Sequence, residues 1–224
     1  MIRPLNLPKT DGEGVPYLSY SQVSTWIKSK RDYMRQYFYG ERFEGNAYTE
    51  FGTKVGEALE HNDFKDFELD EQEFLKTIPR YDRFEMEIKL EMDGFYMKGF
   101  IDTLKLPDDH KQGQIVEFVP IIADYKTGDI EKKRADYESD DYIQLEIYAA
   151  DILQRFNSLP EKVEVILIGR KGNAFKREEL ILTKEFITIT REVTEERVEA
   201  VKSLVQEVAE DIARHYEVFL KLNK

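Results

Sequence analysis

The spacing of apolar residues divides the chain into regions of different period. Near the N-terminus, apolar side chains recur every three or four residues, which predicts amphipathic helices at about 19–37 and 49–64. Between residues 84 and 126 the period becomes two, which is typical of strands with one buried face. Beyond residue 142 helical and strand-like periods alternate. This succession predicts an α/β fold.

Three strands follow one another in the middle of the chain. Phe84 to Leu90 alternates between apolar and polar residues, and Asp93-Gly94 then gives a hairpin turn into a returning strand at 95–106. A polar turn is expected at 108–113. The third strand, 114–126, contains a continuous apolar stretch, so we expect it to be central and covered on both faces.

The rest of the chain is predicted to surround these strands as one domain, 1–224. Residues 1–17 are rich in proline and glycine and are expected to form an extended arm. The charged segment that ends at Pro79 shows only weak periodicity. The later elements are a charged loop at 129–141, a helix at 142–156, strands at 163–168 and 180–190, and a long helix at 194–222.

Composition limits the chemistry that the chain can perform. Its 224 residues include no cysteine and three histidines, so thiolate zinc sites, disulfides and cysteine-ligated iron–sulfur clusters are excluded. A metal would be held mainly by oxygen, as Mg²⁺ and Mn²⁺ are. The net charge of −12 argues against nonspecific coating of nucleic acid. Without an apolar membrane span or signal-like start, we expect a cytoplasmic protein that does not contact membranes.

Two acids and a lysine lie on the second and third predicted strands. Asp124 and Lys126 are two positions apart in an apolar strand, so both point to one face while Tyr125 points away. Asp102 lies on the neighbouring strand. Both carboxylates and the backbone carbonyl of Tyr125 could hold a cation that activates water, with Lys126 positioning that water or stabilising phosphate charge. A structural ion pair is the alternative interpretation.

Three segments resemble the ordered motifs of the PD-(D/E)xK nucleases, in particular the RecB-like exonuclease branch with CRISPR adaptation nucleases and phage recombination exonucleases. They are Gly99-Phe100-Ile101-Asp102, Asp124-Tyr125-Lys126-Thr127-Gly128 and Gln144-Leu145-x-x-Tyr148. The resemblance runs from about residue 18 to 204. It implies a restriction-endonuclease-like core of order α-β-β-β-α-β with a mixed central sheet, here with an N-terminal helical lobe and a long C-terminal helix. The implied activity is a metal-dependent exonuclease acting on DNA ends in recombination, repair or phage replication.

The resemblance also implies roles for individual residues. Asp102 and Asp124 would be ligands of Mg²⁺ or Mn²⁺, and Lys126 would be the catalytic lysine. Gln144 and Tyr148 are four residues apart, on one face of the predicted helix. They would contact the substrate phosphate or brace the site. An ordinary buried tyrosine and a capping glutamine are the alternative for this pair.

One departure from the family pattern concerns a metal ligand. Members usually carry a histidine in a G-x-x-x-H-x-x-x-E segment of the first core helix. Here that segment begins at Gly52 and places Gly56 at the histidine position. Glu60, one turn later, is the expected substitute ligand, with Glu57 as second choice and His61 pointing elsewhere.

A second departure concerns the branch that binds an iron–sulfur cluster. Its entry helix bears a cysteine where this chain has Ser29-Lys30-Arg31-Asp32-Tyr33. We therefore expect no cluster. Packing, for example by Trp26 and Tyr33, would hold the two ends of the chain together instead.

Basic clusters at Lys28 to Arg35, Lys132 to Arg134 and Arg170 to Arg177 are candidate DNA contacts on an acidic body. The first is equally consistent with a solvated helix face. Two other functions stay open. The chain could be a binding module for DNA or a partner protein that lost catalysis with the histidine, or a structure-specific endonuclease. A recombination or replication protein is an expected partner.

Overall fold

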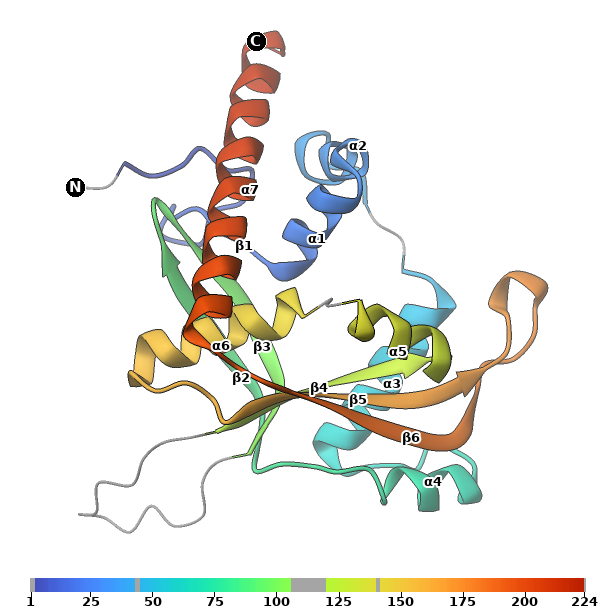
Figure 1. The fold of residues 1–224 in the computed structure, drawn as a ribbon. Helices are drawn as coiled ribbons and strands as arrows, with labels where there is room; N and C mark the ends of the chain where they lie inside the picture. The colour runs from blue at the N-terminus through green and yellow to red at the C-terminus, as the bar shows by residue number, and fades with distance from the viewer. Residues whose placement is uncertain (1–2, 43–44, 106–119, 140–141, 224) are drawn as a thin grey trace.

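The computed structural model describes residues 3–42, 45–105, 120–139 and 142–223, and shows a mixed β-sheet with helices on both faces (Figure 1). The helices are α1 Tyr20–Lys28, α2 Lys30–Tyr33, the π-helix η1 Met34–Phe38, α3 Ala47–His61, α4 Leu69–Leu75, α5 Ile130–Glu138, α6 Ile143–Phe156, the 3₁₀-helix η2 Ala174–Lys176 and α7 Glu195–Leu222. The strands are β1 Tyr17–Leu18, β2 Arg83–Met92, β3 Phe95–Lys105, β4 Ile121–Gly128, β5 Lys162–Lys171 and β6 Ile181–Glu192.

The sheet combines antiparallel and parallel pairs. β3 pairs with β2 and β4 in antiparallel fashion, β4 pairs with β5 in parallel, and β5 pairs with β6 in antiparallel fashion. The short β1 adds a parallel pair at the start of β3. The parallel step from β4 to β5 uses α6 as its crossover, as parallel neighbours require. The predicted α/β fold with a mixed central sheet is therefore confirmed.

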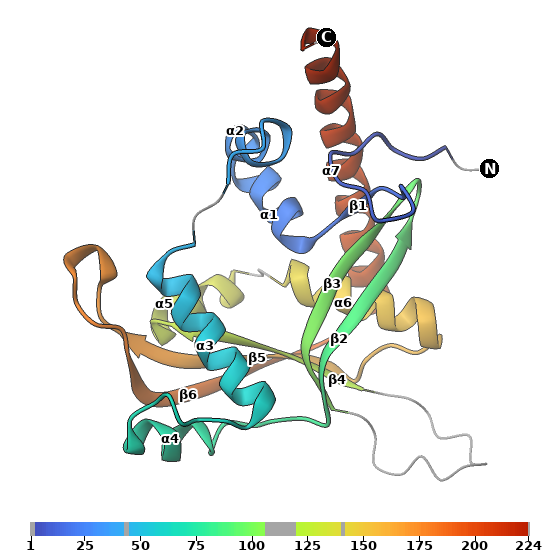
Figure 2. The ribbon, with the colours of Figure 1, turned by 180° about the vertical axis from the view of Figure 1, so that it is seen from behind.

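Successive side chains of the central strands point to opposite faces of the sheet and so pack into two separate cores. On β4, Ile122 packs into a core with α6 and α7, whereas Ala123 packs into a second core with α3. On β5, Val165 and Ile166 divide in the same way. Figure 2 shows α3 across the face opposite to α6 and α7. The prediction that β4 is covered on both faces is confirmed.

The β2–β3 hairpin turns where predicted, at Asp93-Gly94, with Met92 paired to Phe95. Gly94 has a φ of +85°, and a Cβ there would lie 2.7 Å from the carbonyl oxygen of Arg3. The N-terminal segment packs closely on this turn, because the N–H of Leu5 donates to the carbonyl of Gly94 at 2.9 Å. The segment then folds back through a bridge between residues 10 and 16 rather than running straight.

Two helices lie where no regular element was predicted. The segment 129–141, expected to be a loop, contains α5, whose N-cap Asp129 accepts a hydrogen bond from the N–H of Lys132. None of its residues is buried, so it has no apolar stripe that periodicity could detect. The charged segment before Pro79 contains α4, which begins at a capping box of Glu68 and Glu71.

The helix predicted for 19–37 consists of three pieces. Ser29 has an extended backbone, ends α1, and caps α2 by accepting a hydrogen bond from the N–H of Asp32. The helices α3, α6 and α7 follow the predicted ranges closely. The expected turn at 108–113 and the first part of the third strand lie outside the described residues. Within the described ranges, no helix is long and apolar enough to cross a membrane.

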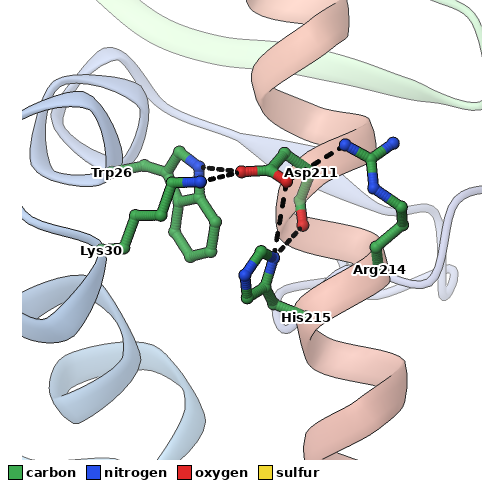
Figure 3. Close-up of polar contacts among 5 residues, drawn as sticks. All are labelled: Trp26, Lys30, Asp211, Arg214 and His215. Atoms are coloured by element: carbon green, nitrogen blue, oxygen red, sulfur yellow. Dashed lines mark hydrogen bonds and ion pairs between the residues drawn. The ribbon is translucent and has the colours of Figure 1, made fainter.

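A carboxylate joins the N-terminal helical lobe, which consists of α1, α2 and η1, to α7 (Figure 3). Oδ2 of Asp211 accepts hydrogen bonds from Nε1 of Trp26 at 3.0 Å and Nζ of Lys30 at 2.6 Å, and Oδ1 accepts one from Arg214 at 3.0 Å. The rings of Trp26 and His215 meet edge to face at 5.1 Å. We call Trp26, Lys30 and Asp211 the lobe clasp.

The clasp predicts a pH-dependent contribution to stability. Hydrogen bonds from Lys30, Arg214 and Trp26 lower the pKa of Asp211 to about 2, against desolvation that raises it. This stabilisation is present above the ordinary aspartate pKa of about 4 and is lost as the pH falls toward 2. Asp211→Asn should lower the free energy of unfolding by about 1 kcal/mol at pH 7, since the ammonium of Lys30 is largely solvated.

Urea unfolding at pH 7 and pH 2 measures this effect, with Asp66→Asn at an exposed position as the control. A difference between wild type and Asp211→Asn that is as large at pH 2 as at pH 7 would contradict the role of the carboxylate.

Candidate active site

The candidate site lies where β3 and β4 separate. Among the described residues the two strands pair through three residue pairs, and the one nearest the start of β3 joins Thr103 to Ala123. Beyond that point the N–H of Tyr125 donates to Oδ2 of Asp102 at 3.0 Å. The carboxylate of Asp102 thus takes the place of the missing strand partner and satisfies a backbone donor. This hydrogen bond fixes Asp102 at the fork of the sheet.

Asp124 and Lys126 lie on one face of β4, with Nζ of Lys126 2.5 Å from Oδ2 of Asp124. The other oxygen, Oδ1 of Asp124, is buried and has no hydrogen-bond partner among the described residues. The Tyr125 side chain points to the opposite face, where its hydroxyl donates to the carbonyl of Pro79 at 2.8 Å. A buried carboxylate oxygen without a partner is costly unless a ligand occupies its lone pairs.

Asp102 and Asp124 lie at neighbouring positions just beyond the pairing of β3 with β4, and their charges interact. Lys126 forms an ion pair with Asp124, and its charge also acts on Asp102. Burial, and then the charge of Asp124, raise the pKa of Asp102. Burial lowers the pKa of Lys126, but the charges of Asp124 and Asp102 outweigh it, so the net pKa of Lys126 is raised. Lys126 therefore stays charged, and the acid pair favours binding of a proton or a further cation.

Two residues of α6 brace the lysine. Nζ of Lys126 donates to Oε1 of Gln144 at 3.2 Å, and Nε2 of Gln144 donates to the hydroxyl of Tyr148 at 2.8 Å. Tyr148 is buried, and its burial raises its pKa, so the hydroxyl stays protonated. Of the two predicted roles, this chain of hydrogen bonds favours bracing of the site over direct contact with substrate.

A groove of about 950 Å³ opens beside these residues. Four of the predicted site residues line it, namely Glu60, Asp102, Tyr125 and Lys126. The remaining three, Asp124, Gln144 and Tyr148, lie outside its lining. The groove runs between α3 and the end of β4, so a bound molecule would lie directly against Asp102 and Lys126.

The position of the family histidine opens into the same groove. Gly56 lines it, and a Cβ built on Gly56 would meet no atom within 4 Å. Glu60 and Glu57 also line the groove, whereas His61 does not. Within the described ranges, however, no three acidic, histidine or cysteine side chains lie close enough together to hold a metal ion. Glu60 as substitute ligand therefore stays a prediction.

Glu85 is a groove residue that the sequence pattern did not reveal. It lies on β2 between Phe84 and Met86, whose partners on β3 flank Asp102. Its φ of +49° is in the left-handed region, which is unfavourable for a residue with a side chain. Burial and the charge of Glu60 raise the pKa of Glu85. In the sequence it is an ordinary polar position of an alternating strand, so no signal distinguishes it.

Two of the three basic clusters reach the groove. Lys133 on α5 and Arg170 on β5 both line it. The cluster from Lys28 to Arg35 does not line the groove. Two of its residues form ion pairs elsewhere. Lys30 belongs to the lobe clasp, and Nη2 of Arg35 lies 2.7 Å from Oε2 of Glu41. For this cluster the structural interpretation is favoured.

Solved structures of low sequence identity share this fold. A candidate exonuclease from Eubacterium rectale superposes with a TM-score of 0.54 at 12% identity, over 94% of this chain and 88% of that one. LHK-Exo, an alkaline exonuclease from Laribacter hongkongensis solved in complex with dAMP, gives a TM-score of 0.50 at 10% identity, over 92% of each chain. No functionally curated protein is detectably similar in sequence.

The family itself is recognised from the sequence. Residues 65–219, more than half of the chain, match the profile of the PD-(D/E)XK nuclease superfamily. The match includes the fork at Asp102, the Asp124–Lys126 pair and the bracing helix α6. The resemblance inferred from the three motifs is thereby confirmed, and the chain belongs to the PD-(D/E)XK nuclease superfamily.

Proposed function

We propose that the protein is a divalent-metal-dependent deoxyribonuclease that hydrolyses phosphodiester bonds at DNA ends. The observation that carries this proposal is the acid pair of Asp102 and Asp124 beside Lys126, with one buried Asp124 oxygen that lacks a partner among the described residues. Family membership supports nuclease chemistry at this position.

The donor atoms at the fork suit a hard divalent cation. Asp102, Asp124 and the backbone carbonyl of Tyr125 would hold it, and Mg²⁺ commonly uses one or two carboxylates and keeps several waters. When bound, such an ion supplies Lewis acidity and lowers the pKa of a coordinated water. Its charge would also relieve the repulsion between the two aspartates.

The chain's own residues hold the phosphodiester in place. Lys126, fixed between Asp124 and Gln144, can donate hydrogen bonds to phosphate oxygens whose negative charge grows during hydrolysis. The Gln144–Tyr148 hydrogen bond restricts the rotation of this arrangement. Lys133 and Arg170 can contact neighbouring phosphates along the groove and fix the register of the strand.

An exonuclease is favoured over an endonuclease because two of the solved structures that share the fold are described as exonucleases. The net charge of −12 supports binding at one groove rather than along the length of a duplex. A role in recombination, repair or phage replication, and a protein partner in such a process, stay predictions.

Loss of the lysine should abolish most activity. Lys126→Ala removes the donor to the phosphate and should lower kcat on linear DNA by roughly 100-fold or more with Mg²⁺ or Mn²⁺. The assay follows release of nucleotides, with Lys202→Ala on α7 as the control and thermal unfolding as a check of the fold. Activity within a few-fold of wild type would contradict the proposed role.

Linear and circular DNA distinguish an exonuclease from an endonuclease. An enzyme that acts at ends should degrade a linear duplex or linear single strand while leaving the covalently closed circular form of the same sequence intact. Gel electrophoresis of matched linear and circular substrates measures this difference. Conversion of the circle to a linear form would favour the endonuclease alternative.

The glycine in the first core helix offers a gain-of-function test. Gly56→His places an imidazole in open space on the groove, so it should tighten Mn²⁺ binding about tenfold or more, as a further ligand would. Isothermal titration calorimetry measures the affinity. Gly56→Ala is the matched control, because it also adds a Cβ and raises helix propensity but supplies no ligand. Equal affinities in the two variants would show that the position does not reach the metal.

A further inference from the structure

The loop between β5 and β6 is fixed against the start of α3. We call residues 170–177, from Arg170 to Arg177, the 170–177 loop. The hydroxyl of Tyr48 donates to Oδ1 of Asn173 at 3.3 Å and accepts from the N–H of Ala174 at 3.1 Å. Figure 1 and Figure 2 both show the loop projecting from the sheet beside α3. The loop therefore has a defined position next to the groove.

The loop is also ordered internally. Oδ1 of Asn173 accepts hydrogen bonds from the N–H groups of Phe175 and Lys176, which form η2. A register shift in the β5–β6 ladder between Ile168 and Arg170 marks a bulge at its base. Bulges bend a strand and redirect the side chains that follow.

This ordered loop presents an aromatic ring to solvent. Phe175 is 83% exposed, although its ring lies 5.7 Å from that of Tyr48 in a tilted contact. Single exposed apolar residues are common on protein surfaces. Phe175 differs because its backbone is pinned by Asn173 and its ring neighbour Tyr48 lines the groove.

Next to Tyr48 lies a cation, Arg170, that has no acidic partner among the described residues. The guanidinium of Arg170 lies over the Tyr48 ring, 4.3 Å from its centroid, and lines the groove. Its Nε is buried and has no hydrogen-bond partner among the described residues. An exposed aromatic ring beside an available guanidinium is the combination that holds a nucleobase and its phosphate.

We propose that Phe175 stacks on a nucleobase with a free face while Arg170 binds a backbone phosphate of the same strand. The inference rests on the proposed function and specifies its substrate. Inside a duplex both faces of every base are covered by neighbours, so a ring could enter only at the cost of unstacking a base step, whereas a terminal base pair or an unpaired base receives it without that cost. The 170–177 loop would thus give the nuclease its preference for ends.

Substitutions at one position separate stacking from mere apolar contact. Stacking on one base should strengthen binding about 5- to 100-fold. Phe175→Ala and Phe175→Leu should both lose this factor, whereas Phe175→Trp should keep it. Leu69→Ala, at an equally exposed position on α4, is the control and should bind as wild type does.

The probes are a 12-nucleotide single strand and a blunt hairpin duplex, each with a terminal 2-aminopurine, in EDTA to prevent hydrolysis. Fluorescence anisotropy gives the affinity, and quenching of 2-aminopurine reports stacking on the ring. Loss of quenching in Phe175→Ala on the single strand alone identifies an unpaired base as the ligand. Loss on the blunt hairpin identifies the terminal pair.

The outcomes distinguish this inference from the proposed function. If wild type binds but Phe175→Ala has the same affinity and the same quenching, the stacking role is overturned and the nuclease proposal stands. If wild type binds neither probe and cuts no linear DNA with Mg²⁺ or Mn²⁺, the proposed function fails, and the inference fails with it. Weakening by Phe175→Ala with an unchanged melting temperature supports stacking.

Discussion

The placement of Asp102 and Asp124 at neighbouring positions of two diverging strands is the constraint around which the site is arranged. Asp124 is buried and Asp102 half-buried, their charges repel each other, and one lysine compensates only part of that charge. The arrangement persists because each acid is bound elsewhere, Asp102 by the N–H of Tyr125 and Asp124 by Lys126. The structure thus keeps two carboxylates close together at a position where a proton or a cation would lower their repulsion.

The surrounding architecture supports this charge in a particular way. Because β4 is covered on both faces, its backbone cannot shift to separate the acids without disturbing two cores at once. In the described part of the chain β3 and β4 diverge beyond the Thr103–Ala123 pair, and Asp102, Tyr125 and Lys126 line the groove there. On the α6 side the site packs against a core, and on the α3 side it opens into the groove. A molecule can therefore approach the site from the α3 side.

Much of this was predictable because local and global signals agree. The period of two located β2 and β3, Asp93-Gly94 located their turn, and the spacing of Asp124 and Lys126 placed both on one face. α5 was not predicted because all of its residues contact solvent, so its sequence shows no periodic spacing of apolar residues. Glu85 escaped for a different reason. Its place in the groove depends on a left-handed backbone conformation, which the residue types of an alternating strand do not indicate.

The lobe clasp has a consequence for the conditions under which the N-terminal lobe stays attached to α7. This chain fastens the N-terminal lobe to α7 with the carboxylate of Asp211, the indole of Trp26 and the ammonium of Lys30. None of these contacts uses a thiol, and the chain contains no cysteine. Attachment of the lobe through the clasp therefore needs neither a bound metal nor a particular thiol redox state.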